Sequence, residues 1–448
     1  MSQILWFRRD LRITDSALLS CSKGKVLPIF IFDKNILGKL PSDDKRVSFI
    51  YKSVLNLKQK LKNIGLDLAI FYDEPSNVFK KLKSKGFDEV LCSIDFDSYA
   101  KKRDEEIETI LPVKRYLDSF ILNPIEHLKA DSTPYKVFTP FYKSLNIITS
   151  SNSIETYERN EKLLKIEFEY DLVPTLEDMG FKEQLLPSFL LKDAYTLLDE
   201  FKEKIANYKE SRDYFYIDGT SKISVHLRFG LISPKEVFNY FKLFDDIDSE
   251  FFIRELFWRE FYNYILFNFP NSETKNFNNI DIKWSENEEH FEKWCKGETG
   301  VPIIDAAMRH LNETGTMHNR LRMIVASFLT KNLFIDWKKG EEYFALKLLD
   351  YEASSNIGSW QWGASTGADA SPYFRVFNPY TQSKKFDSEA IFIKSVIPEL
   401  ENIDSKLLHI ENGASSNLFV AYPKSIVDIS QSRKQAIEKF KRAKNENT

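Results

Sequence analysis

The sequence predicts an α/β N-terminal domain with a parallel, doubly wound sheet, then a long connector, then an all-α C-terminal domain. Three observations predict this order. Short apolar runs alternate with helical stretches in the first quarter of the chain, prolines and polar residues then break the pattern, and helical periodicity dominates the rest. The length of 448 residues also exceeds that of one average domain. We therefore expect domains at residues 1–125 and 188–448, joined by a connector at residues 126–187.

The N-terminal segment contains four strand-like runs, which read QILWF, VLPIFIF, DLAIFY and EVLCSI. Amphipathic stretches such as RVSFIYKSVLNLKQKLKNIG separate them, and this alternation is typical of βαβ units on a parallel sheet. Ligands of such sheets bind outside the carboxyl ends of the strands. No G-x-G-x-x-G follows any of these runs, which disfavours a dinucleotide bound in the usual fingerprint manner.

The connector is marked by Pro134, Pro140, Pro174 and a polar ITSSNS run. Beyond it, segments such as SEFFIRELFWREFYNYILF and RLRMIVASFLTKNLFI have helical period. Six of the seven tryptophans fall within this helical part, and buried indole N–H groups need hydrogen-bond partners. Aromatic core packing is the simpler interpretation. The six are Trp258, Trp284, Trp294, Trp337, Trp360 and Trp362.

Composition indicates a globular protein that buries substantial cores, with 43% hydrophobic and 29% charged residues. The sequence lacks an apolar run long enough to span a membrane and opens on a strand-like segment without a signal sequence, so we expect a cytoplasmic protein without a membrane partner. Cys21, Cys92 and Cys295 are odd in number and far apart, which argues against disulfides. The histidines form no H-E-x-x-H motif, and we expect no metal.

A net charge of −3 does not by itself indicate a nucleic-acid-binding protein. Basic residues mixed with aromatics nevertheless concentrate in the C-terminal half, where they form either a local basic groove or ordinary solvated helix faces. These residues are Arg309, Arg320, Arg322, Lys331, Lys338, Lys339, Arg375, Lys384 and Lys385.

Residues 350–379, DYEASSNIGSWQWGASTGADASPYFRVFNP, combine many aromatic and small residues with little charge. Serines and glycines interrupt every apolar stripe of a core helix, and small residues let a large flat group approach the backbone. Trp360 and Trp362 flank Gln361, and side chains two positions apart on a helix point in different directions. We expect the two indoles to face different surroundings.

The segment SNIGSWQWGASTGADASPYFRVFNP resembles the flavin-embracing segment of the DNA photolyase and cryptochrome family. Four more family-like motifs occur in the family's order: WFRRDLRITD at 6–15, GTSKIS at 219–224, ELFWREFY at 255–262 and MHNRLRM at 317–323. Within the family, the chain is most similar to class I cyclobutane pyrimidine dimer photolyases. The resemblance implies a light-driven carbon–carbon lyase in which reduced FAD donates an electron to a pyrimidine dimer in ultraviolet-damaged DNA.

The GTSKIS motif offers hydroxyl and N–H groups suited to a pyrophosphate, although serine or threonine before a helix is usually an N-cap. Asn356 falls where photolyases place an asparagine facing flavin N5, whereas plant and insect cryptochromes usually have Asp or Cys, so Asn356 favours repair. Glu352 stands where the family usually has Asp. The resemblance implies FAD contacts from Tyr208, Thr220, Ser221, Lys222, Ile223, Ser224, Phe252, Arg259, Arg322, Asp350, Tyr351, Glu352 and Asn356.

Glu255 and Trp258 are three residues apart and therefore share one face of a helix. Photolyases extrude their target from the duplex and hold it against aromatic side chains. His318 is followed by Asn319 rather than by the second histidine of the (6-4) class, which points to cyclobutane dimers. The resemblance implies lesion or DNA contacts from Arg212, Glu255, Trp258, Asn319, Arg320, Met323, Trp362, Arg375 and Gln382. It implies catalytic roles for Glu255 and Asn356 and for the electron-hopping residues Trp360, Trp337 and Trp284.

A second, light-harvesting chromophore is also implied by the resemblance. The segment at 95–104 lacks the Asn-Glu pair of folate-binding photolyases, so a deazaflavin or flavin fits better than folate. The residues that either line this antenna site or are ordinary polar residues of loops are Arg46, Asp95, Asp97 and Tyr99.

Two other functions remain open at this stage. A cryptochrome-like photoreceptor would signal rather than repair, and sensory members commonly carry a long C-terminal extension, whereas this chain continues only briefly beyond Gln382. A flavin oxidoreductase would need a nicotinamide fingerprint, which the sequence lacks. We expect a monomer.

Overall fold

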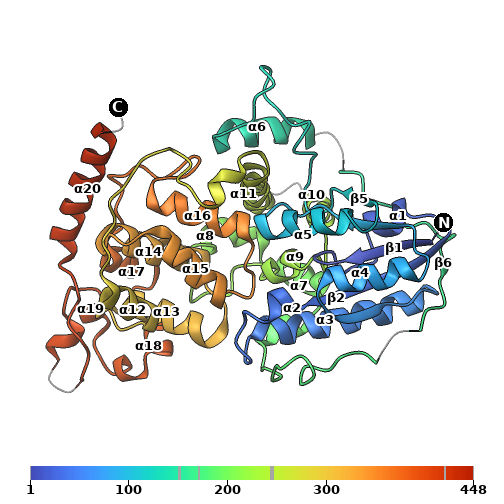
Figure 1. Cartoon of the computed structure of the whole chain (residues 1–448). Helices are drawn as coiled ribbons and strands as arrows, with labels where there is room; N and C mark the ends of the chain where they lie inside the picture. The colour runs from blue at the N-terminus through green and yellow to red at the C-terminus, as the bar shows by residue number, and fades with distance from the viewer. Residues whose placement is uncertain (1, 150–152, 170–171, 243–246, 418–419, 447–448) are drawn as a thin grey trace. The chain divides into compact units, whose positions relative to one another are not determined.

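The computed structural model describes all residues except 1, 150–152, 170–171, 243–246, 418–419 and 447–448 (Figure 1). The chain divides into two compact units. Unit 1 comprises Met1–Pro134, Tyr142–Glu203 and Ser221–Pro270, and unit 2 comprises Tyr135–Phe141, Lys204–Thr220 and Asn271–Thr448.

A parallel sheet forms the centre of unit 1, as predicted. Its strands are β1 (Ser2–Phe7), β2 (Lys25–Asp33), β3 (Ala69–Asp73), β4 (Glu89–Ser93), β5 (Val113–Tyr116) and β6 (Leu164–Lys165). The order is β3-β2-β1-β4-β5, with β6 paired to β2, and every pairing is parallel. The strand order reverses between β1 and β4, which is the position where doubly wound sheets bind ligands.

Burial on both faces explains why these strands are almost continuously apolar. In β2 only Lys25 is exposed, and Ile4, Ile29 and Val90 of adjacent strands lie in one buried core. The ring of Trp6 in that core lies 4.9 Å from Phe79.

Several helices of unit 1 begin at aspartate N-caps. Asp44, Asp97 and Asp193 each accept a backbone N–H from the first turn that follows them. The α-helices within unit 1 are α1 (Ala17–Cys21), α2 (Lys34–Leu37), α3 (Lys45–Asn63), α4 (Pro75–Ser84), α5 (Ser98–Glu108), α7 (Ala194–Lys202), α9 (Ser224–Arg228), α10 (Pro234–Lys242) and α11 (Ile247–Asn268), with the 3-10 helix η1 (Ser188–Leu191).

Unit 2 is helical, and an isolated bridge pairs Ser285 with Ile335. Its core contains the fully buried rings of Trp294, Trp337 and Trp360. Its α-helices are α8 (Tyr208–Ser211), α12 (Glu288–Lys296), α13 (Pro302–Thr314), α14 (Asn319–Ser327), α15 (Trp337–Lys347), α16 (Ala353–Ala364), α17 (Pro379–Phe386), α18 (Ile391–Val396), α19 (Ser405–Leu408) and α20 (Ile429–Glu446). Short helices are η2 (Ile205–Asn207), η5 (Pro398–Leu400), η6 (Ala414–Ser416) and the π-helix η4 (Phe328–Asn332).

The parallel N-terminal sheet and the helical C-terminal region agree with the predicted fold class. The two units nevertheless interleave along the sequence, because α11 belongs to unit 1 although it lies within the predicted domain 188–448. Helices α6 (Phe138–Thr149) and η3 (Pro270–Glu273) each span a unit boundary, and α6 lies inside the predicted connector. The boundaries at residues 125 and 187 stay a prediction of how the chain is organised.

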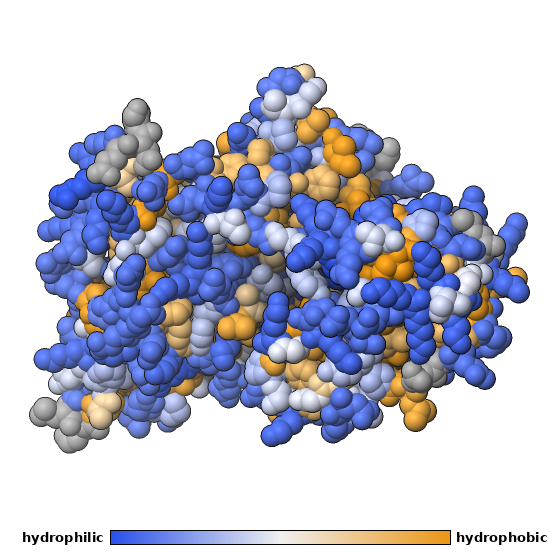
Figure 2. All heavy atoms as spheres, in the orientation of Figure 1, coloured by the Kyte–Doolittle hydropathy of each residue, from blue (hydrophilic) through white to orange (hydrophobic). Residues whose placement is uncertain are grey.

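Hydrophilic residues dominate the face of the molecule drawn in Figure 2. Among the residues that the structure describes, no helix is both long and apolar enough to cross a membrane.

Candidate functional site

Helix α16 carries the sequence S-W-Q-W, and a buried glutamine anchors this helix within unit 2. The Nε2 of Gln361 donates to the carbonyl oxygens of Ser272 at 2.7 Å and Lys275 at 3.2 Å. Its Oε1 accepts the backbone N–H of Phe277 at 2.9 Å. These hydrogen bonds satisfy a side chain that water cannot reach and tie α16 to the segment before α12. Sequence analysis did not recognise this role of Gln361.

Trp360 occupies a close-fitting aromatic environment. Its ring centroid lies 6.0 Å from Trp294 and 5.0 Å from Phe344, with the rings edge to face. Gly340 on α15 lies against the same indole, because a Cβ at this position would come within 2.2 Å of the Trp360 Cη2 atom. Trp360 therefore occupies space that a side chain at position 340 would otherwise fill.

The three tryptophans that the resemblance assigns to electron hopping differ in exposure. Trp360 is 2% exposed and Trp337 is 1% exposed, whereas Trp284 is only partly buried. The indole N–H of Trp337 donates to Asn276 Oδ1 at 2.8 Å. A donor chain from a buried cofactor to solvent requires this arrangement of two buried rings and one that water can reach.

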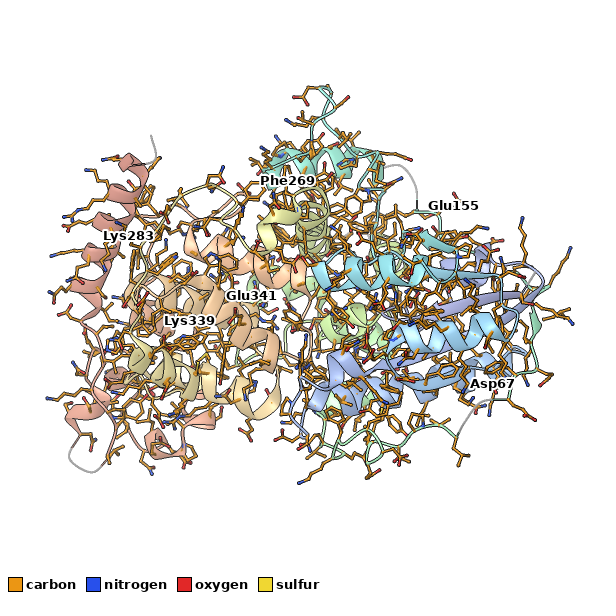
Figure 3. All side chains as sticks on the ribbon, viewed as in Figure 1. Asp67, Glu155, Phe269, Lys283, Lys339 and Glu341 are labelled. Atoms are coloured by element: carbon orange, nitrogen blue, oxygen red, sulfur yellow. The ribbon has the colours of Figure 1, made fainter. Side chains whose placement is uncertain are left out.

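Asn356 on α16 is held by Glu341 on α15, which is labelled in Figure 3. The amide Nδ2 donates to Glu341 Oε1 at 2.9 Å and to the Glu341 backbone oxygen at 3.1 Å. Burial raises the pKa of Glu341, although the hydrogen bonds from Asn356 and Tyr351 oppose the rise. The amide orientation is thereby set, and Oδ1 of Asn356 accepts no hydrogen bond from any described residue. Sequence analysis missed Glu341, whose charge alone is typical of a helix surface.

Arg322 and Asp350 form an ion pair. Nη2 of Arg322 donates to both carboxylate oxygens, at 3.0 and 2.8 Å, while Nε donates to the Met317 carbonyl at 2.8 Å. The Asp350 side chain is 11% exposed, so the pair is partly shielded from water. Glu352 is buried two residues further on, and Tyr351 donates its hydroxyl to Glu341 Oε1 at 3.4 Å.

The basic residues of unit 2 that were expected to contact DNA differ in their surroundings. Arg320 pairs with Asp213 at 2.7 Å and lies over the Phe386 ring at 4.6 Å. Arg212 lies 5.8 Å from the Tyr208 ring centroid, and Arg375 is exposed. Of the remaining candidates in this unit, Asn319 is exposed, and those that are partly buried are Met323, Trp362 and Gln382.

Helix α11 in unit 1 carries four of the candidates. Glu255 and Trp258 are both partly buried, and the Trp258 ring lies 5.8 Å from that of Tyr262. Phe252 is buried among phenylalanines, with ring centroids 4.9 Å from Phe201 and 4.8 Å from Phe241. Phe252 therefore also packs the helical core of this unit.

Arg259, the fourth candidate on α11, donates from Nη1 to the Ser119 carbonyl at 3.1 Å. Burial lowers the pKa of Arg259 to about 9, and the nearby positive charges of Arg9 and Arg228 add to this effect. Its neighbour Glu260 accepts the backbone N–H groups of Ile121 and Leu122 at 2.9 and 3.1 Å. These contacts connect α11 with the segment after β5.

The GTSKIS motif crosses the unit boundary, with Gly219 and Thr220 in unit 2 and residues 221–224 in unit 1. A Cβ at Gly219 would lie 2.6 Å from Ser211 Oγ, so this position excludes a side chain. Lys222 adopts a left-handed φ of 55°. The N-cap of α9 is Ile223, which forms no side-chain capping hydrogen bond. The alternative that a hydroxyl of this motif caps the helix is therefore wrong.

The antenna candidates lie near the carboxyl ends of β1, β2 and β4. Arg9 follows β1 and pairs with Asp95 after β4 at 3.3 Å, and the Tyr99 hydroxyl donates to Asp33 at the end of β2. Burial opposes ionisation of Asp95, but Arg9 and neighbouring arginines outweigh it and lower the pKa of Asp95 to about 2. Charged groups therefore concentrate at the strand ends next to the topological switch point.

Asp97 and Arg46 have local partners. Asp97 caps α5 by accepting the backbone N–H of Ala100 at 2.8 Å, and burial raises the pKa of Asp97. Arg46 forms an ion pair with Asp44 at 2.5 Å at the start of α3.

Comparison with known proteins agrees with this fold. Residues 3–156 match the model of DNA photolyase, and residues 252–442 match that of the FAD binding domain of DNA photolyase. The deoxyribodipyrimidine photo-lyase of Alkalihalophilus pseudofirmus is 35% identical over 481 residues, covering 98% of this chain and 97% of the relative. That of Halobacterium salinarum is 33% identical over 482 residues and covers 99% of each chain.

Solved structures show the same similarity over the whole length. The class III photolyase of Agrobacterium tumefaciens has a TM-score of 0.86 at 32% identity, covering 99% of this chain and 98% of that one. An archaeal photolyase from Sulfolobus tokodaii, solved with two FAD molecules, has a TM-score of 0.83 at 31% identity, covering 99% and 100%. A cryptochrome from Synechocystis has a TM-score of 0.86 at 26% identity, covering 98% of each chain.

The fold and the helical region around α16 therefore define a flavoprotein with an FAD-binding domain of the photolyase type. This chain belongs to the DNA photolyase family.

Proposed function

We propose that this chain is a deoxyribodipyrimidine photo-lyase that repairs cyclobutane pyrimidine dimers in ultraviolet-damaged DNA in blue or near-ultraviolet light. The observation that carries the proposal is the fixed amide of Asn356. Because Glu341 accepts both hydrogen bonds from Nδ2, the carbonyl oxygen is the group that Asn356 offers to a cofactor. The full-length relatives named deoxyribodipyrimidine photo-lyase support the same reaction.

The residues of unit 2 fit FAD. Asn356 supplies a neutral acceptor for a ring N–H of the flavin. Asp350 belongs to the same sequence motif as Asn356, and the two hydrogen bonds from Arg322 hold its carboxylate in one orientation. Bound reduced FAD would supply the electron that splits the dimer. Trp360, Trp337 and Trp284 would conduct the electron that restores the reduced cofactor. We assign the remaining cofactor contacts to Tyr208, Thr220, Ser221, Lys222, Ile223, Ser224, Phe252, Arg259, Tyr351 and Glu352.

Glu255 and Trp258 on α11 would hold the extruded lesion, Trp258 by stacking and Glu255 by hydrogen bonding. Contacts to phosphates position a duplex without reading its sequence. We assign the other lesion and DNA contacts to Arg212, Asn319, Arg320, Met323, Trp362, Arg375 and Gln382.

A flavin is our proposal for the antenna chromophore. The solved Sulfolobus tokodaii photolyase contains two FAD molecules, and this chain places Asp95 and Tyr99 near the strand ends of a similar sheet. Asp97 and Arg46 would support the site from the starts of α5 and α3.

The test is repair of ultraviolet-treated DNA by purified, chemically reduced protein in blue light and in darkness. We expect loss of cyclobutane dimers only in the light, and activity on (6-4) products alone would exclude the proposed substrate. Trp258→Ala should weaken lesion binding by roughly 1–3 kcal/mol, the value of one base–aromatic stack. Trp258→Phe keeps an aromatic face and serves as the matched control.

A cryptochrome-like photoreceptor is the second candidate, because the Synechocystis cryptochrome shares the whole fold. Light-induced absorbance changes of the flavin without any dimer repair would favour it. The class I assignment, the monomeric state, the cytoplasmic location and the absence of a metal stay predictions.

A further inference from the structure

A pocket in unit 2 involves none of the residues assigned above to FAD, to the lesion or to the antenna. Its walls come from the π-helix η4, from residues 376–378 and from the first turns of α20, and they enclose about 530 Å³, part of it open to solvent. The enclosed part of this space is about 180 Å³, which suits one portion of a small molecule, such as a single ring, with the rest of the ligand outside.

Asn332 of η4 lines this pocket and lacks a donor for its carbonyl oxygen. The side chain is 5% exposed, and Nδ2 donates to Ser432 Oγ at 2.9 Å. Its Oδ1 accepts no hydrogen bond from any residue that the structure describes. A buried acceptor without a donor is destabilising, so a ligand with an N–H group would satisfy it.

The rest of the wall combines apolar side chains with two cations. Val376, Phe377 and Ile437 offer contact area for a flat ring. Arg433 and Lys434 are exposed at the pocket, and neither forms an ion pair with a described residue. A ligand that matches these groups has a planar N–H-bearing ring and an anionic group.

The start of α20 does not itself attract the anion. Asp428 accepts the backbone N–H of Gln431 at 2.7 Å, and Glu411 accepts that of Ile429 at 3.2 Å. These two carboxylates already satisfy the first turn and would repel a phosphate. The anionic group therefore belongs at Arg433 and Lys434, one turn further along the helix.

The basic character continues along α20 beyond the pocket. The helix carries six basic residues against Glu438 and Glu446, a net charge of +4 in a chain whose total is −3. One phosphate needs fewer cations than this, whereas a strand of successive phosphates uses several of them. The basic residues are Arg433, Lys434, Lys439, Lys441, Arg442 and Lys444.

We propose that this pocket is a second nucleotide-binding site, separate from the lesion site. The base enters between Phe377 and Ile437 with a ring N–H on Asn332 Oδ1, and its phosphate lies on Arg433 and Lys434. Lys441 and Lys444, on the same side of α20 as Arg433 and Lys434, hold further phosphates when the nucleotide belongs to a single strand. A free nucleotide and an unpaired nucleotide of a strand share this chemistry, and the charge of α20 favours the strand.

The experiment measures fluorescence anisotropy of a labelled, undamaged oligothymidylate, with thymidine 5′-monophosphate as competitor. We expect Arg433→Gln combined with Lys434→Gln to weaken binding roughly tenfold and to flatten the log–log salt slope by about 0.7 per lost phosphate contact. Lys406→Gln, an exposed lysine outside the pocket, removes the same kind of charge and should leave both quantities unchanged. Equal losses in the pocket variant and in Lys406→Gln would overturn the proposal.

Two further measurements distinguish a free nucleotide from a nucleic-acid strand and test the contact between the base and Asn332. Competition by the monophosphate assigns the pocket to a free nucleotide, and binding of the strand alone assigns it to nucleic acid. An oligonucleotide of N3-methylthymidine lacks the ring N–H and should bind the parent protein more weakly, whereas equal binding would refute the contact with Asn332. The measurements are repeated in Arg212→Gln, because undamaged strands that bind this variant as tightly as the parent do not depend on the phosphate contacts assigned to the lesion site.

Discussion

Replacing Gly340 by alanine tests whether the space under Trp360 is as tight as the structure shows. The new Cβ would lie 2.2 Å from Trp360 Cη2 and 2.6 Å from Leu329 Cδ2, whereas ordinary contact begins at 3.4 Å. Trp360 must therefore move by about 1.2 Å and Leu329 by about 0.8 Å. Neither can turn out to solvent, because Trp360 is 2% exposed and Leu329 is 0% exposed.

The expected loss follows from two opposing effects. Overpacking of a core costs about 1–3 kcal/mol, and this overlap lies at the upper end because two rigidly held side chains are involved. Alanine in a helix interior returns roughly 1 kcal/mol relative to glycine. We therefore expect Gly340→Ala to lower the free energy of unfolding by about 2 kcal/mol.

Gly363→Ala is the matched control, because its Cβ would meet only Ala326 Cβ at an ordinary 3.5 Å. This variant should keep the unfolding free energy of the parent or raise it by up to about 1 kcal/mol. Urea unfolding followed by circular dichroism, at equal cofactor content, compares the three proteins. Equal stabilities of the two variants would refute the inference that Trp360 packs tightly on Gly340.

Three more outcomes are expected. Burial lowers the pKa of Lys331 to about 7. Between about pH 7 and the ordinary pKa of lysine, the unfolded chain therefore binds more protons than the folded chain. The free energy of unfolding of the parent protein rises with pH over this window. Lys331→Met should remove this rise in urea titrations at neutral and alkaline pH, and a persistent rise would assign it to another group. Trp360→Phe should bind FAD and, when chemically reduced, repair dimers, but it should lose photoreduction of the flavin. If flash photolysis gives the parental rate of photoreduction, electrons reach the flavin by another route, and Trp294 is the next candidate. Arg375→Ala should flatten the log–log salt dependence of lesion binding by about 0.9, and an unaltered slope would show that Arg375 contacts no phosphate.

The fold could be predicted because its signals are periodic and local. Apolar runs bounded by polar N-caps such as Asp44 and Asp97 mark strands and helices one at a time. The assignment of α11 to unit 1 could not be predicted in this way, since it depends on long-range contacts such as Glu260 with the backbone of Ile121. Periodicity identifies an element but not the element that it packs against.

Part of the site was equally beyond prediction from the sequence. Arg322 and Asp350 could be named as candidates because both fall within recognisable motifs, and the structure joins them in an ion pair. Glu341 carries no such mark, and its role exists only because α15 places its carboxylate 2.9 Å from the Asn356 amide. Gly340 likewise differs from any other helical glycine only through the indole against it. These residues act by contact, and contact between distant segments leaves no periodic trace in a sequence.

The two tryptophans of α16 illustrate how one local rule gains its meaning from packing. Side chains two positions apart must diverge on a helix, and Trp360 is indeed buried against Trp294 and Phe344 while Trp362 is only partly buried. Divergence alone would let the helix rotate and exchange their surroundings. Gln361 prevents this, because its three hydrogen bonds are satisfied in one rotation of α16 only. The polar residue between the indoles therefore determines which tryptophan belongs to the core and which remains near the surface of unit 2.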